Sequence, residues 1–362
     1  MASNLRDMDD GVHGDPGQLI ARATGAETRG RARLSTAIDD FFLAREGRLD
    51  DRMRTAVAQT LAGLIGAVER ALTAHAARLL NAREAVALAA RVGRGDGSVL
   101  ERLATAGVLR DSELMRELIA RAQQDVIGDA LPAAAPPRAD DPSLLTRLAN
   151  HSDSVVAAAA AALLAAESRR RGGIEGDLRA ELFHRLIWWV VAALRDRFGD
   201  AEDLPALDRA LTDAALRSLA AHDEGDRMEA VALRLAAAYD AAPRDLPDLL
   251  VEALGDRRIA LFTALLAHAL GLEYEQARDV VTDPDGGQLW LMLRALDAGR
   301  TAIARIGLAL CEADGRRDLD GFAESLDPIM AISAHDARAA LAPMKLHPDF
   351  RAALAALAGA AK

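Results

Sequence analysis

The sequence is poor in cysteine, in aromatic residues and in strand-forming runs. Cys311 is the only cysteine among 362 residues, so an intrachain disulfide and a zinc site built from several cysteines are excluded. Only 3% of the residues are aromatic, and the apolar residues are mostly alanine and leucine, which favour helices over strands. Long alternating runs of β-branched residues are missing as well. We therefore expect an all-α fold.

Long apolar runs and a positive net charge are also lacking. The longest apolar runs, residues 155–166, 186–194 and 259–272, fall short of the roughly 18 residues that a membrane span requires. The first residues, MASNLRDMDDG, are polar and acidic and do not resemble a secretory signal. The net charge of −11 disfavours non-specific binding to nucleic acid or anionic lipid. We expect a cytoplasmic protein with no membrane span.

The sequence contains none of the common motifs for phosphate binding or hydrolysis. The patterns GxxxxGK[ST], GxSxG and HExxH do not occur. DPDGG, residues 283–287, starts like a calcium loop, but its glycine is one position early and Arg294 stands where a bidentate glutamate is required. Glu181 and His184 could share a helix face, yet no further ligands lie at a matching spacing. We assign no catalytic, metal-binding or cofactor-binding residue.

His268 and Cys311 are candidates for a catalytic or redox role, and we interpret both as structural. His268 lies at the border of an apolar helix face, and no carboxylate lies four positions before or after it to prepare it as a base. We expect its ring to be satisfied by backbone or water. Cys311 lies between apolar positions, and the acidic neighbours Glu312 and Asp314 oppose the lowered thiol pKa that redox chemistry needs.

Composition divides the chain into four parts. Residues 1–30 show little periodicity and are expected to be a loose tail. Residues 31–130 form an N-terminal helical region. Residues 131–142, LPAAAPPRADDP, contain four prolines, which cannot continue a helix, and are predicted to be an exposed linker. Residues 143–362 form a C-terminal region of successive helices.

Glycines recur every sixteen residues in this C-terminal region. They are Gly255, Gly271 and Gly287, followed by Gly299 and Gly315. A helix of about 12 residues and a short turn fit each interval, so two units form a helix pair of about 32 residues. Within ALGDRRIALFTALLAHALGL, residues 253–272, we expect Asp256 to cap the start of a helix and Gly271 to end it in the left-handed conformation.

Several longer stretches resemble a known family. They are DLPDLLVEALGDRRIALFTALLAHALGLEYEQARDVVTDPDGGQLWLMLRAL, the later DARAALAPMKLHPDFRAALAAL, and the earlier RLSTAIDDFFLAREGRLDDRMR and LIWWVVAALRDRF. In these stretches the chain resembles uncharacterised alphaproteobacterial proteins catalogued as domain of unknown function 2336. The resemblance implies a HEAT-like array of antiparallel helix pairs, which can form a curved solenoid. It implies no activity, so no site residue is carried over.

Two features could contact a partner. The arginine run SRRRGG, residues 168–173, contributes Arg169, Arg170 and Arg171, which we expect in a loop, where guanidinium groups could bind an acidic partner or a phosphate. In the helix expected at residues 181–198, Trp188 lies beside the polar strip and Trp189 beside the apolar face. We predict that Trp189 is the more deeply buried and that Trp188 has an exposed edge, a possible binding anchor.

These observations favour a non-enzymatic helical-repeat protein that binds an unknown protein partner, as an interaction or signalling scaffold. One alternative is a nucleic-acid-binding repeat, which would show a continuous arginine stripe on one face. Another is an enzyme whose site assembles from distant helices, which would show a deep pocket where several of His184, His222, His268 and acidic residues converge. We expect no cofactor.

Overall fold

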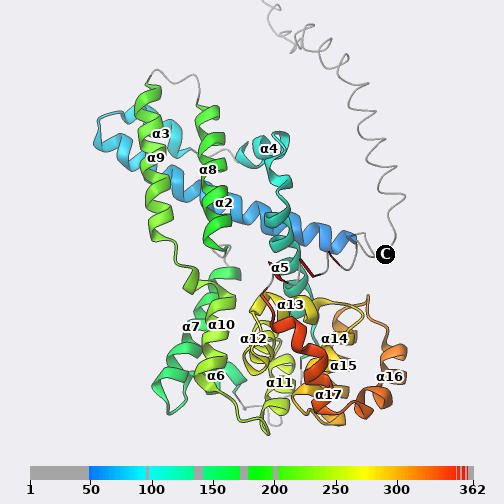
Figure 1. The fold of residues 1–362 in the computed structure, drawn as a ribbon. Coiled ribbons are helices and arrows are strands. Elements are labelled where there is room, and N and C mark those ends of the chain that lie inside the picture. Colours follow the sequence, from blue (N-terminus) through cyan, green and yellow to red (C-terminus); the bar gives the residue numbers. More distant parts are fainter. Residues whose placement is uncertain are drawn as a thin grey trace, which may run out of the picture. The chain divides into compact units, whose positions relative to one another are not determined.

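The computed structural model describes residues 49–94, 98–133, 142–171, 178–198 and 203–347, together with residues 349, 350, 353, 354 and 357. These residues contain sixteen α-helices and no β-strand, which confirms the all-α prediction (Figure 1). The expected tail at residues 1–30 and most of the predicted linker, residues 134–141, lie outside the described residues. No described helix is long and apolar enough to cross a membrane.

The first helices occupy residues 51–130. They are α2 (Asp51–Ala82), α3 (Val86–Gly93), α4 (Ser98–Thr105), the short 3-10 helix η2 (Val108–Arg110) and α5 (Ser112–Ala130). The helices of the middle of the chain are α6 (Leu144–Ala149), α7 (Ser154–Arg171), α8 (Ala180–Arg197), α9 (Leu204–Ala221), the 3-10 helix η3 (Glu224–Asp226) and α10 (Met228–Tyr239).

The remaining helices are shorter and follow one another closely. They are α11 (Leu246–Gly255), α12 (Ile259–Leu270), α13 (Tyr274–Thr282), α14 (Gly287–Ala295), α15 (Arg300–Ala313), α16 (Leu319–Ala331), α17 (Ala334–Leu341) and the 3-10 helix η4 (Ala342–Lys345).

Local sequence signals set many helix ends. The side chain of Asp111 accepts a hydrogen bond from the N–H of Leu114 at 2.8 Å, and that of Asp203 accepts from the N–H of Ala206 at 3.0 Å. Both interactions satisfy donors in the first turn of a helix that have no partner inside it. Gly271 ends α12 at φ +65°, as predicted from the sequence.

The prediction for Asp256 was wrong. Helix α12 starts at Ile259 and its N-cap is Arg258, whereas Asp256 is the C-cap of α11. The Asp256 carboxylate instead accepts a hydrogen bond from the N–H of Leu144, the first residue of α6. A capping side chain can serve any nearby helix, so sequence order alone did not identify the one that Asp256 serves.

Two apolar clusters form the core, and each draws on distant parts of the chain. In the first, helices α2–α5 pack with α8 and α9 through residues such as Leu72, Leu118 and Leu186. The second unites the end of α5 with α6, α7 and α10–α17 through residues such as Ile127 and Phe262. Helix α5 therefore belongs to both clusters, and residues 52–362 form one compact unit.

Many contacts join helices that are far apart in sequence. Helix α10 packs against α7 and α12, α5 packs against α12, α13 and α15, and α14 packs against α17. The contacts of α5 with α13 and α15 go beyond those of a linear stack, in which each repeat touches only its neighbours. Helices α11, α12 and α13 do pack in consecutive pairs, as a repeat array requires.

Buried ion pairs accompany these contacts. Arg278 of α13 donates to both carboxylate oxygens of Glu117 of α5, at 3.0 and 2.9 Å. On the same two helices, Gln124 donates to the hydroxyl of Tyr274 at 2.5 Å. Burial raises the pKa of Tyr274, and the negative charge of Glu229 adds to that shift. Tyr274 therefore acts here as a neutral hydrogen-bonding group.

Candidate functional site

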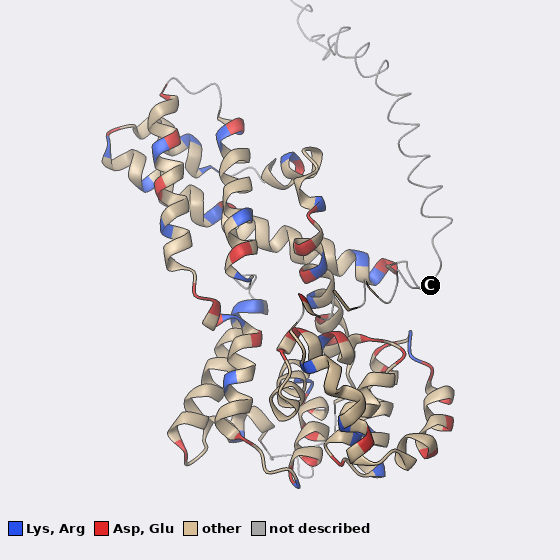
Figure 2. Cartoon of the chain, in the orientation of Figure 1, with Lys and Arg blue, Asp and Glu red and all other residues tan. Residues whose placement is uncertain are grey.

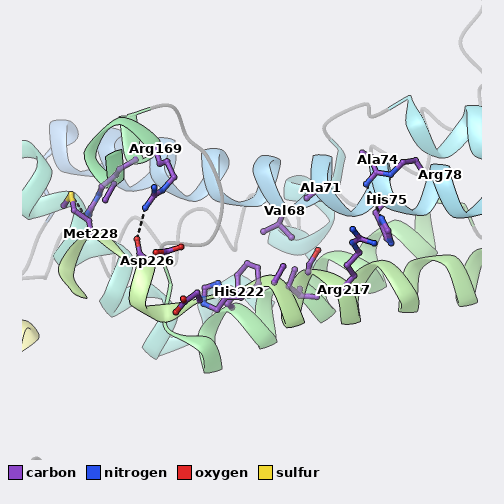
Figure 3. A pocket seen from close by; sticks show the side chains of 17 residues that line it. Val68, Ala71, Ala74, His75, Arg78, Arg169, Arg217, His222, Asp226 and Met228 are labelled. Atoms are coloured by element: carbon purple, nitrogen blue, oxygen red, sulfur yellow. Dashed lines mark hydrogen bonds between the residues drawn. The ribbon is translucent and has the colours of Figure 1, made fainter. Parts of the chain in front are cut away.

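A cleft of about 500 Å³ lies between α2, α7, α8, α9 and the segment that leads into α10 (Figure 3). Its lining includes three buried apolar side chains, Val68 of α2 and Phe183 and Ile187 of α8. Charged side chains lie at both ends, with Arg169 and Asp226 at one end and Arg78 and Arg217 at the other. The cleft thus combines an apolar middle with polar ends, as many ligand-binding sites do.

His222 closes one side of the cleft and is held in place. Its ring stacks on Phe183 with centroids 4.2 Å apart and an interplanar angle of 19°. Its Nε2 lies 3.0 Å from the carbonyl oxygen of Leu178, which can only accept, so Nε2 carries the hydrogen. The ring is therefore fixed by packing and by one hydrogen bond to the backbone.

The arginine run predicted for partner contact continues a helix, so its expected position in a loop was wrong. Residues 168–171 are the last residues of α7. Arg169 lines the cleft and donates to the backbone oxygen of Asp226 at 3.2 Å. The side chain of Arg171 lies outside the described residues.

Arg170 is buried in an ion-pair network. Its side chain is 8% exposed and contacts Glu229 at 3.1 Å and Asp125 at 3.3 Å. Glu229 is buried, which by itself raises a carboxyl pKa, but the positive charges of Arg170 and Arg121 outweigh burial and lower the pKa of Glu229 to about 2. Arg170 thus holds α5, α7 and α10 together, and it lines the cleft together with Arg169.

The other end of the cleft carries three nitrogen-bearing side chains that the sequence analysis did not single out. Arg78 and His75 lie one turn apart on α2, and Arg217 lies on α9 (Figure 3). The guanidinium of Arg78 is 3.2 Å from Nδ1 of His75. Burial lowers the pKa of His75, and the charges of Arg217 and Arg78 lower it further. A histidine and an arginine three apart on a helix are only a weak indication of a binding site in a sequence. Arg217 lies on another helix, and only the fold brings it close to them.

Trp188 lies away from this cleft, on another face of α8. Its indole Nε1–H donates to Nε2 of His184 at 3.3 Å. Trp188 and Trp189 are both partly buried and pack against the first apolar cluster. The predicted difference in burial between them is not seen. Glu181 and His184 share one shallow surface depression, as their spacing indicated.

The three histidines considered for an assembled active site lie in separate places. His222 lines the cleft, and His184 lies on the outer face of α8. His268 lines a different cavity, where its Nε2 is 3.1 Å from the Asp240 carboxylate, a side-chain partner in place of the backbone or water expected. Cys311 is partly buried, and burial raises its pKa. Among the described residues, no three His, Cys, Asp or Glu side chains are placed to hold a metal ion.

A second surface feature lies near the end of the sequence. Phe350, Leu354 and Leu357 are 53%, 44% and 71% exposed. Each of the three described residues has helical backbone, and their spacing of four and three is the spacing of residues that share a face of a helix. We call these three residues the Phe350 stripe.

Comparison with known proteins gives a family and no activity. No curated protein and no solved structure matches the chain. A family described as "Uncharacterised protein conserved in bacteria (DUF2336)" matches residues 133–342, which is more than half of the chain. The match spans α6 to α17 and includes every element that lines the cleft except α2, while α2 and α5 lie outside it. With its all-α fold, this chain belongs to the uncharacterised bacterial family DUF2336.

Proposed function

We propose that this chain is a non-enzymatic helical module that binds another protein. The observation that carries the proposal is the Phe350 stripe, three large apolar side chains at helical spacing and all well exposed. Single exposed apolar residues are common on protein surfaces, whereas a contiguous set favours an interaction site. Amphipathic helices that dock into an apolar groove present residues at this spacing. The partner would therefore supply an apolar groove.

The proposal also includes a HEAT-like repeat arrangement and a cytoplasmic location. A HEAT-like arrangement is supported by the consecutive pairing of α11, α12 and α13, but not by the contacts that α5 makes with α13 and α15. The cytoplasm is the proposed compartment, on the basis of sequence composition alone.

Nucleic-acid binding has less support. Figure 2 shows acidic and basic residues interspersed over the helices in this view, and many arginines bind carboxylates, as Arg83 does Asp213. The net charge of −11 further opposes binding to a phosphate backbone.

The test is affinity capture from the native cell with the full-length tagged chain, followed by mass spectrometry. A variant with Phe350→Ser, Leu354→Ser and Leu357→Ser removes the apolar face, and Val155→Ser, at a residue 64% exposed on α7, is the matched control. We expect a protein that the wild type and V155S retain and the triple variant loses, and that rebinds in purified form. Equal capture by all three chains would overturn the assignment of the stripe.

A further inference from the structure

One end of the cleft holds two guanidinium groups, those of Arg78 and Arg217, that form no ion pair with a described carboxylate. Arg217 makes no hydrogen bond or ion pair with the residues that the structure describes, and the hydrogen bond of Arg78 goes to the neutral ring of His75. Asp213 lies one turn before Arg217 on α9 and its charge acts on His75, but its carboxylate binds Arg83 at 3.1 Å. Two guanidinium groups from facing helices are therefore free to bind an anion.

His75 adds a third donor at the same place. A guanidinium can only donate, so Nδ1 of His75 accepts from Arg78 and the hydrogen of the neutral ring is on Nε2. The neutral form is consistent with the lowered pKa, which results first from burial and then from Arg217 and Arg78. In Figure 3 the side chain of Arg217 extends towards the ring of His75. The Nε2–H and the two guanidinium groups are thus gathered at one end of the cleft.

We propose that this end of the cleft binds the phosphoryl group of a small phosphate monoester, whose apolar part lies along Val68, Ala71 and Ile187. The site goes beyond the proposed protein-binding function and shares no residue with the Phe350 stripe. Arg78 and Arg217 bind the phosphoryl oxygens as charge-assisted donors, and His75 orients the group through Nε2–H.

A phosphoryl group fits this donor set better than a carboxylate does. One arginine can satisfy both oxygens of a carboxylate in a bidentate pair. A phosphate monoester offers three acceptor oxygens and close to two negative charges at neutral pH, which matches two guanidinium groups and a ring N–H. The volume of about 500 Å³ is typical of a small-molecule site.

The experiment titrates the purified full-length chain with phenyl phosphate, inorganic phosphate and benzoate by calorimetry. We expect phenyl phosphate to bind more tightly than both of the others, because only it supplies a phosphoryl group and an apolar body. Histidine NMR, with the His75 signal assigned through His75→Gln, should show the pKa of His75 rising when phenyl phosphate binds. Arg78→Gln and Arg217→Gln should each weaken binding by about tenfold or more.

Arg209→Gln is the matched control. It removes the same charge from α9, but its guanidinium donates to the backbone oxygen of Pro205 outside the cleft, so binding should be unchanged. Circular dichroism of every variant checks that the fold is retained. If benzoate binds as tightly as phenyl phosphate, the site does not select a phosphoryl group and that assignment is wrong. If inorganic phosphate binds as tightly as phenyl phosphate, the apolar body of the ligand does not contact the cleft as proposed. If a phosphoserine peptide binds more tightly than phenyl phosphate, the ligand is a phosphorylated protein and the small-molecule proposal is wrong. If Arg209→Gln weakens binding as much as Arg78→Gln and Arg217→Gln do, binding depends only on the overall positive charge and the proposed site is wrong.

Discussion

Arg278 and Glu117 form a bidentate ion pair between α13 and α5, with both side chains at most 6% exposed. Glu117 lies outside the family-matched residues 133–342, and Arg278 lies within them. The α-helical unit of this chain therefore includes elements that the family match does not cover. The pair also gives a direct way to measure how firmly α5 is attached.

Glu117→Ala should reduce the free energy of unfolding by about 3–5 kcal/mol, because it leaves the Arg278 guanidinium buried without its partner. The double variant Glu117→Leu with Arg278→Met replaces both charges by apolar groups and should lose much less. Urea unfolding followed by circular dichroism measures both. A double variant as unstable as the single one would show that packing, and not the unpaired charge, determines the loss.

Acid should destabilise the protein through Glu229. Its pKa falls from an ordinary 4.5 to about 2 in the folded state, because the charges of Arg170 and Arg121 outweigh burial. A lowered folded-state pKa means that the stabilisation is fully present above the unfolded pKa and is lost as the pH falls through the folded one. The free energy of unfolding should therefore decline between about pH 5 and pH 2.

Glu229→Gln should remove the part of the acid-induced fall in the free energy of unfolding that comes from Glu229. At pH 7 this variant should be less stable than the wild type, which keeps the ion pair there. The control is Asp196→Asn, since Asp196 pairs with Arg102 at the surface with 74% of its side chain exposed. Urea unfolding at several pH values compares the slopes. A Glu229→Gln variant with the wild-type slope would contradict the prediction.

Two glycine-to-alanine changes should have opposite effects. A Cβ at Gly307 of α15 would lie 2.0 Å from the Phe322 ring, which itself packs against Trp290 with centroids 4.7 Å apart. Gly307→Ala should cost about 1–3 kcal/mol or more through overpacking. A Cβ at Gly63, inside α2, would meet nothing within 4 Å, so Gly63→Ala should stabilise by about 0.5–1 kcal/mol. Thermal unfolding distinguishes the two, and a stabilised Gly307→Ala would contradict the packing described.

Trp188→Ala and Trp189→Ala should destabilise the protein to a similar degree. Both rings are partly buried against the same apolar cluster, so each loss should stay below the roughly 3–5 kcal/mol typical of a fully buried aromatic side chain. Urea unfolding gives the stabilities, and capture of the partner tests Trp188 as an anchor. A much larger loss for Trp189 would support the burial order predicted from the sequence.

The sequence predicted features that depend on neighbouring residues. Gly255 and Gly271 lie where α11 and α12 end, and Gly287 and Gly299 lie where α14 and α15 start, because helix boundaries are set by local backbone properties. Asp283 lies at the end of α13 and its side chain accepts from the N–H of Asp285, so DPDGG begins with a turn that follows a helix.

Features that depend on packing between distant helices were missed. Arg170 lies four residues after Ala166 and seven after Leu163, both buried, so extending the apolar periodicity of α7 would have placed Arg170 on the buried face. The acidic partners that make this burial possible, Asp125 and Glu229, lie on other helices. No pattern within a single segment indicates them, and the same holds for Arg217 opposite Arg78.

The position of α5 also has a consequence for synthesis. Its packing partners α12, α13 and α15 are all made later, and Arg278 follows Glu117 by 161 residues. At ribosomal rates of about 5–20 residues per second, α5 waits on the order of ten to thirty seconds for Arg278. During that interval Glu117 has no native ion-pair partner, and the surface of α5 that α12, α13 and α15 cover stays exposed until those helices are made.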